Sequence, residues 1–132
     1  MCMAEMILCA SRYPILKNDL EKHVKLLSLF TSIISGYAST DDFKEEYQTV
    51  LEKEIELMEH SINHFKFIHP FDNEEAAHLN LIRTHIRKCE HQLWKQKNTY
   101  SSAMYSYINR LSDWYYLKSI EVISLDQSFS ND

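Results

Sequence analysis

The chain has 132 residues, 45% of them hydrophobic and 25% charged, so it is long enough for one domain with a sizeable core and too short for two. Its net charge of −5 argues against nucleic acid as a partner, and no apolar run approaches the roughly 18 residues of a membrane span. One glycine and two prolines favour long helices joined by short turns, because sheets and loop-rich folds need more residues that bend tightly.

The cysteines and the first residues bear on the compartment. Cys2, Cys9 and Cys89 are odd in number and form no Cys-x-x-Cys pair, which favours reduced thiols in an intracellular protein. The first residues also lack the basic region and the cleavage site of a secretory signal. We therefore expect a cytoplasmic protein. Cys89 has the spacing of a core residue, and we expect it to be buried.

Apolar residues recur every three or four positions over most of the chain, which is typical of helices with one buried face. A short helix over residues 2–13 should stop before Pro14, because the residue ahead of a proline avoids the helical region. Three long helices are expected at about 18–37, 42–64 and 73–97, and a fourth follows a capped turn at 98–102 and runs to about Leu125. The sequence thus predicts an all-α, up-down bundle in a single domain over residues 1–132, with a frayed polar tail at 126–132.

Several residues mark the expected helix ends. Gly36 stands where the first long helix should stop, and residues 39–42 (Ser-Thr-Asp-Asp) supply N-caps for the second. Asp72 with Glu75 resembles a capping box that opens the third long helix. Between the second and third long helices, residues 65–71 read Phe-Lys-Phe-Ile-His-Pro-Phe. Three aromatic rings in a predicted loop indicate packing or a ligand.

Charged side chains follow the apolar face of the last two helices. Arg83, Arg87 and Glu90 lie at i, i+4 and i+7 and so share one face of a helix. The apolar residues beside them are Leu79, Ile82, Ile86, Cys89 and Leu93. Asn109 and Asp113 are one turn apart on the last helix. Their apolar neighbours are Met104, Ile108, Leu111 and Tyr115. If the two helices pack side by side, two guanidinium groups, an amide and two carboxylates gather at one edge.

Three blocks of sequence carry a resemblance. They read Phe67-Ile68-His69-Pro70, then Arg83-Thr84-x-x-Arg87-Lys88-x-Glu90, then Asn109-Arg110-Leu111-Ser112-Asp113. In this order and spacing the chain resembles the ATP:cob(I)alamin adenosyltransferases of the trimeric five-helix type, whose last block the pentapeptide matches without change. The resemblance implies a ferritin-like helical bundle that forms a homotrimer with active sites between subunits. There, reduced cobalamin attacks C5′ of ATP and triphosphate leaves.

The resemblance also implies roles for single residues. Arg83, Arg87 and Lys88 would hold the polyphosphate, since a guanidinium fork fits phosphate oxygens. Glu90 and Asn109 would help to place the nucleotide, its Mg²⁺ or the arginines.

Two further residues complete the implied site. Asp113 would orient an arginine or close the interface. Phe67 would cover the lower face of the corrin and exclude the ligand that cobalt otherwise binds, which makes cobalt easier to reduce. Together with Arg87, Phe67 is thus the expected catalytic residue, and no resident metal site is expected.

The chain also departs from the family pattern. The family begins with a Gly- and Thr-rich segment that cradles the triphosphate and continues into Asp-Glu-Leu-Asn. This chain starts after that segment, and the acidic pair falls near Cys2 and Met3. Lys88 and His91 stand where the family has arginines, and Phe71 and Asp72 stand where it has glycines. We therefore expect a short family member in which half of the ATP site is missing.

Other interpretations stay open. In one, Arg83 and Arg87 form ion pairs with Asp113 and Glu90 in a purely structural bundle. In a second, the chain is a non-catalytic relative that binds a corrinoid or a protein after losing the phosphate loop. A generic helical bundle whose motifs arose by chance is the third.

Two polar patterns and a tyrosine-rich stretch complete the candidates. Glu56, His60 and His64 share a helical face that suggests a metal site, but an exposed polar face is the commoner explanation. Glu75-x-x-His78 is one copy of a motif that a di-iron bundle needs twice. The tyrosines are expected to pack the bundle and to fill a subunit interface. They are Tyr100, Tyr105, Tyr107, Tyr115 and Tyr116.

Overall fold

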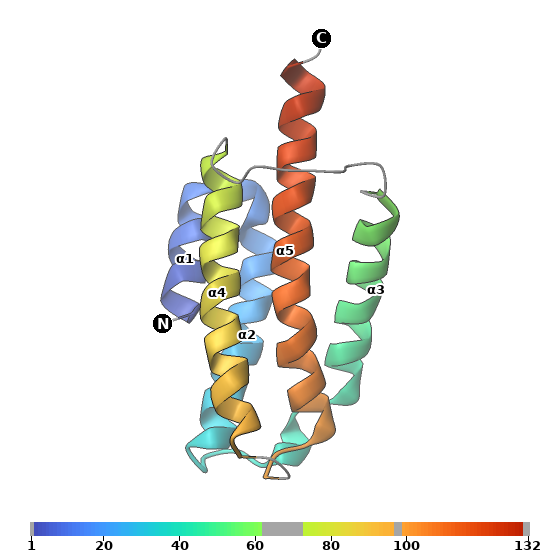
Figure 1. Cartoon of the computed structure of the whole chain (residues 1–132). Helices are drawn as coiled ribbons and strands as arrows, with labels where there is room; N and C mark the ends of the chain where they lie inside the picture. Colours follow the sequence, from blue (N-terminus) through green and yellow to red (C-terminus); the bar gives the residue numbers. More distant parts are fainter. Residues whose placement is uncertain (1, 62–72, 97–98, 131–132) are drawn as a thin grey trace.

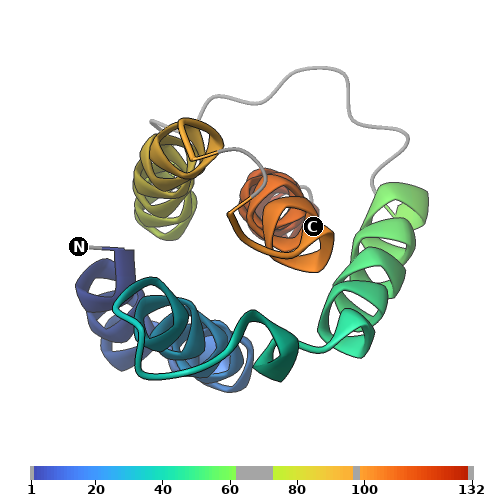
Figure 2. The same ribbon diagram turned by 90° about the horizontal axis from the view of Figure 1, so that it is seen from below.

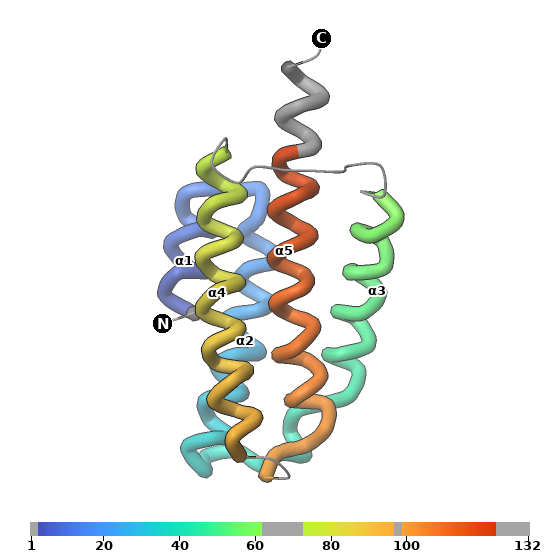
Figure 3. Tube along the Cα trace, in the orientation of Figure 1, coloured from blue at the N-terminus to red at the C-terminus, as the bar shows by residue number. Residues whose placement is uncertain are grey.

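The computed structural model describes residues 2–61, 73–96 and 99–130. They form α1 (Cys2–Arg12), α2 (Lys17–Ile34), α3 (Glu45–Ser61), α4 (Glu74–Trp94) and α5 (Ser102–Ser130), with short 3-10 turns at Pro14–Leu16 and Thr40–Asp42. The predicted all-α bundle, with one short helix before four long ones, is confirmed for this part of the chain. Successive helices run in alternating directions (Figures 1 and 3).

The helix α5 stands at the centre of the bundle. Seen from below, α4, α2 and α3 surround it, and α1 lies beside α2 (Figure 2). The central position fits its sequence, because apolar side chains cover most of its circumference. Its buried side chains include Met104, Tyr107, Ile108, Leu111, Trp114 and Tyr115. The apolar line predicted for this helix is therefore confirmed.

The apolar residues predicted for α4 are buried with one exception. Leu79, Ile82, Ile86 and Leu93 are each at most 7% exposed. Cys89 is exposed, so the prediction that it lies in the core was wrong. It lines an open groove together with residues of α1, α2, α4 and α5.

The helix ends differ from the prediction in detail. Gly36 adopts φ 84° just after α2, and the N–H of Tyr37 donates to the Ser32 carbonyl at 2.8 Å, so the glycine ends that helix as expected. The Ser39 capping box forms but opens the 3-10 turn, and α3 begins only at Glu45.

The next two helices begin and end differently as well. Asn73 caps α4 by accepting from the Ala76 N–H at 2.9 Å, whereas Asp72 lies outside the described residues. The helix α5 runs to Ser130, beyond the predicted end near Leu125.

Candidate functional site

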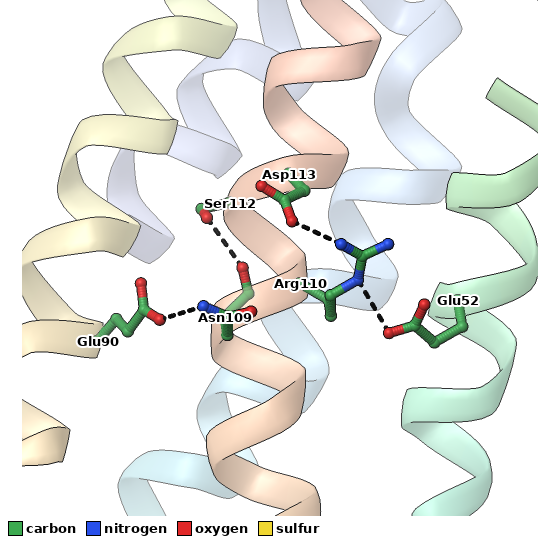
Figure 4. A network of polar contacts seen from close by, with 6 residues as sticks. All are labelled: Glu52, Glu90, Asn109, Arg110, Ser112 and Asp113. Carbon is green, nitrogen blue, oxygen red and sulfur yellow. Dashed lines mark hydrogen bonds and ion pairs between the residues drawn. The ribbon is translucent and has the colours of Figure 1, made fainter. Parts of the chain in front are cut away.

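The seam between α4 and α5 brings together residues from two of the three sequence blocks. At one end, Asn109 Nδ2 donates to Glu90 Oε2 at 2.6 Å (Figure 4). At the other end, the Arg83 guanidinium lies 5.2 Å from the centre of the Tyr116 ring. The two contacts are seven residues apart on each helix, as antiparallel packing requires. The expectation that the two helices pack side by side is thus met.

Between these contacts Arg87 offers positive charge to solvent, and Lys88 follows it about 100° further round α4. Arg87 and Lys88 are exposed, and neither forms an ion pair with another residue in the described part of the chain. The helical register places Arg87 level with Ser112 on α5. The buried Ser112 hydroxyl donates to the Asn109 carbonyl at 2.9 Å, so its hydrogen is already used within the helix. Arg87 and Lys88 are therefore available to an anion.

The arginine that is fixed by carboxylates is Arg110. Its Nε donates to Glu52 Oε1 at 2.9 Å and its Nη1 to Asp113 Oδ2 at 2.8 Å, which ties α3 to α5 (Figure 4). The side chain of Arg110 is 30% exposed. The sequence interpretation included Arg110 in a motif but gave neither it nor Glu52 a role. The three-residue spacing of Arg110 and Asp113 was a local signal for that pair, whereas Glu52 is distant in sequence.

These contacts change one alternative interpretation. Among the described residues, Asp113 pairs with Arg110 and Glu90 accepts from Asn109. The ion pairs of Asp113 and Glu90 with Arg83 and Arg87 do not form there, so that version of the structural bundle was wrong. Asp113 pairs with Arg110 instead because the two residues lie within one turn of the same helix.

Some expected site features fall outside the described residues. Phe67 and its loop are among them, and so is His64. Glu56 and His60 are exposed on α3. In the described ranges no group of three or more His, Cys, Asp or Glu side chains is placed to hold a metal ion. Nor does any helix there have the length and apolar character needed to cross a membrane.

The geometry defines what the seam can bind. Two guanidinium groups and one ammonium group stand on α4, and an amide from α5 is held against a carboxylate beside them. Guanidinium groups bind phosphate oxygens through two parallel hydrogen bonds, and the ammonium group adds a point charge. A polyphosphate is therefore the ligand class that fits these side chains.

Comparison with known proteins finds one family model that matches most of the chain. A family model described as cobalamin adenosyltransferase matches residues 7–121, a range that includes both helical blocks of the seam. A search of curated proteins and a search of solved structures each gave no match.

Proposed function

Because the chain belongs to the cobalamin adenosyltransferase family, we propose that it transfers the 5′-deoxyadenosyl group of ATP to the cobalt of a reduced corrinoid. In this reaction the cobalt electron pair attacks C5′ and forms a cobalt–carbon bond. The C5′–oxygen bond breaks, and triphosphate leaves with the bonding electrons. The family match supports the reaction. The cluster of cations at the α4–α5 seam is the observation in this chain that supports it.

The polyphosphate is assigned to Arg83, Arg87 and Lys88. Arg83 lies over the Tyr116 ring, which limits the orientations of its guanidinium plane. Arg87 and Lys88 are exposed and can close on phosphate oxygens when ATP arrives. Developing charge on the leaving triphosphate is then met by cations that are already in place.

Asn109 and Glu90 are assigned to positioning. The 2.6 Å hydrogen bond between them fixes the carboxylate three residues from Arg87, on the same helical face. A carboxylate at that place repels anions that do not carry their own cation, and so favours a nucleotide that arrives with a bound metal ion. Asp113 is likewise assigned to positioning, because it accepts a hydrogen bond from Arg110 at the side of α5 that faces α3 (Figure 4).

Magnesium fits this site only as a partner of ATP. Mg²⁺ is commonly bound by one or two carboxylates together with substrate phosphates and water. Glu90 and Asp113 already accept hydrogen bonds from Asn109 and Arg110, and the described residues hold no three-ligand cluster. We therefore propose that Mg²⁺ enters bound to the triphosphate, whose charge it lowers, and that Glu90 is its nearest carboxylate.

The corrinoid is assigned to a site completed by a neighbouring subunit of a homotrimer. Phe67 is assigned to the lower face of the corrin, where an apolar ring keeps water from the cobalt. The support for both assignments is membership of the family. Light scattering of the purified chain tests the trimer directly.

The first experiment is an anaerobic titration of the protein with cob(II)alamin, with and without MgATP, followed by the visible spectrum. We expect a four-coordinate cobalt signature that appears only when ATP is present. Absence of any spectral change, in a protein that is trimeric by light scattering, would favour a non-catalytic relative and overturn the proposed reaction.

Matched variants assign the activity to the seam. Arg87→Ala should lower kcat/KM for ATP by roughly 10- to 100-fold, because a charge-assisted hydrogen bond to phosphate is lost. Lys53→Ala is the control, since Lys53 is an exposed cation on α3 away from the seam. Phe67→Ala should remove the cobalt signature and leave ATP binding unchanged. Equal ATP affinity in Arg87→Ala and the unaltered chain would refute the phosphate assignment.

A further inference from the structure

An aromatic ring on α5 meets one of the cations of the seam. The Arg83 guanidinium carbon lies over the Tyr116 ring, 5.2 Å from its centre. A distance below about 6 Å is that of a cation–π contact, in which the negative face of the ring attracts the cation. Tyr116 is 47% exposed, so the contact forms at the surface, where a ligand can reach the cation.

The ring takes the place that a carboxylate often has beside an arginine. In the described part of the chain, Arg83 contacts this ring and forms no ion pair. The carboxylates of the two seam helices bond other residues, since Glu90 accepts from Asn109 and Asp113 accepts from Arg110. Arg83 is therefore oriented by a group that carries no net charge.

Arg110 is fixed in the opposite way. Its guanidinium donates to Glu52 at 2.9 Å and to Asp113 at 2.8 Å. The two carboxylates offset its positive charge, so Arg110 attracts a further anion only weakly. An aromatic face limits the orientation of a guanidinium without this loss of charge. Of the two fixed arginines, Arg83 is thus the one that keeps its charge for an anion.

Arg87, one turn further along α4, has no ring beside it among the described residues. The helical register places it level with Ser112, which is small and buried and offers no surface for stacking. Arg87 is exposed, whereas Arg83 is partly buried against its ring. The two arginines therefore differ before any ligand binds, because only the first is held in one direction.

We propose that Tyr116 is a positioning residue for the nucleotide, which orients the Arg83 guanidinium before the triphosphate arrives and leaves its charge intact. This role rests on the proposed function, in which the triphosphate of ATP is the anion that Arg83 binds. Ordering a long side chain on binding weakens affinity, and a side chain that is already ordered avoids this loss. Tyr116 acts through Arg83 and needs no contact of its own with the ligand.

The test measures binding of MgATP and of inorganic triphosphate to the full chain by titration calorimetry, without corrinoid. Tyr116→Leu removes the ring at a half-exposed position and should weaken both affinities about threefold to tenfold, as the ordering of one long side chain implies. Tyr116→Phe keeps the ring face and should bind like the unaltered chain. Tyr37→Leu is the control, because Tyr37 is 90% exposed and belongs to neither seam helix.

A double-mutant cycle separates positioning from a general effect on the fold. In an Arg83→Ala background, Tyr116→Leu should have no further effect, because the group that the ring orients is gone. In an Arg87→Ala background it should keep its full effect. Unchanged affinity in Tyr116→Leu, equal effects in the two backgrounds, or an equal loss in Tyr116→Phe would overturn the role of Tyr116 and leave the phosphate assignment standing. Failure of the unaltered chain to bind either ligand would overturn the proposed function and this role together.

Discussion

At the scale of single residues, burial decides the chemistry of His23. The side chain is fully enclosed between Tyr115 and Trp114, and enclosure disfavours the charged imidazolium. In the unfolded chain the same residue titrates near its ordinary value of 6.5. His23 therefore makes the stability of the fold depend on pH.

The first prediction follows from this difference. Below pH 6.5 the unfolded chain binds a proton at His23 that the folded chain refuses until about pH 3, so stability is full above pH 6.5 and falls as the pH is lowered. Between pH 7.5 and 5.5 the loss in unfolding free energy should be about 1.4 kcal/mol. Urea denaturation measures it. His23→Phe should remove this dependence and Tyr115→Phe should keep it, and a dependence that persists in His23→Phe would contradict the assignment.

The cysteines give a second prediction at this scale. Burial, with Glu75 and Glu5 as smaller causes, raises the pKa of Cys9 to about 11, whereas Cys89 is exposed. Only the thiolate reacts, so a disulfide reagent at pH 8 should label Cys89 rapidly and Cys9 only upon unfolding. The measurement uses a Cys2→Ser background, in which one thiol should react in the native state. Cys89→Ala should abolish that signal, and a second fast thiol would show that Cys9 is accessible.

At the scale of helices, local sequence patterns predicted the helices themselves better than the contacts between them. The helices were predictable because their apolar period is local, and Gly36 marked an end because its φ of 84° suits glycine. Ser39 was correctly predicted to be an N-cap, but the sequence did not show that it caps a 3-10 turn, because a 3-10 turn and an α-helix begin with the same residue types. The hydrogen bond from Arg110 to Glu52 joins residues 58 positions apart in the sequence, and no local pattern predicts it. The prediction that Cys89 is buried was wrong for the same reason, because its exposure depends on residues of other helices.

The contact between α4 and α5 yields the third prediction. Asn109→Asp keeps the shape of the side chain but places a carboxylate where an amide donated to Glu90 at 2.6 Å. Loss of the hydrogen bond and repulsion of the two charges should lower the unfolding free energy by about 1 kcal/mol at neutral pH. Adding Glu90→Gln restores a donor opposite the new carboxylate and should recover most of the loss. Denaturant unfolding of the single and double variants checks this, and two independent, additive losses would contradict a direct contact.

At the scale of the whole molecule, the central helix α5 contacts α4 on one side and α3 on another. Asn109 of α5 reaches toward α4 and the outward-facing seam, while Arg110 reaches toward α3 (Figure 4). A ligand at the seam therefore binds a surface that exists only when α5 is packed against α4. Such a ligand should stabilise the folded state by an amount that grows with the logarithm of the ratio of its concentration to its dissociation constant.

This linkage gives the fourth prediction. MgATP at about 100 times its dissociation constant should stabilise the unaltered chain by about 2.7 kcal/mol, which raises the Tm of a domain of this size by several degrees. Differential scanning calorimetry at fixed protein concentration measures the shift. Arg87→Ala should lose most of it, because the exposed guanidinium that meets the phosphates is gone, whereas Lys53→Ala should keep it. An equal shift in Arg87→Ala would place the nucleotide outside the seam, and the same shift with Mg²⁺ alone would assign the effect to the metal ion.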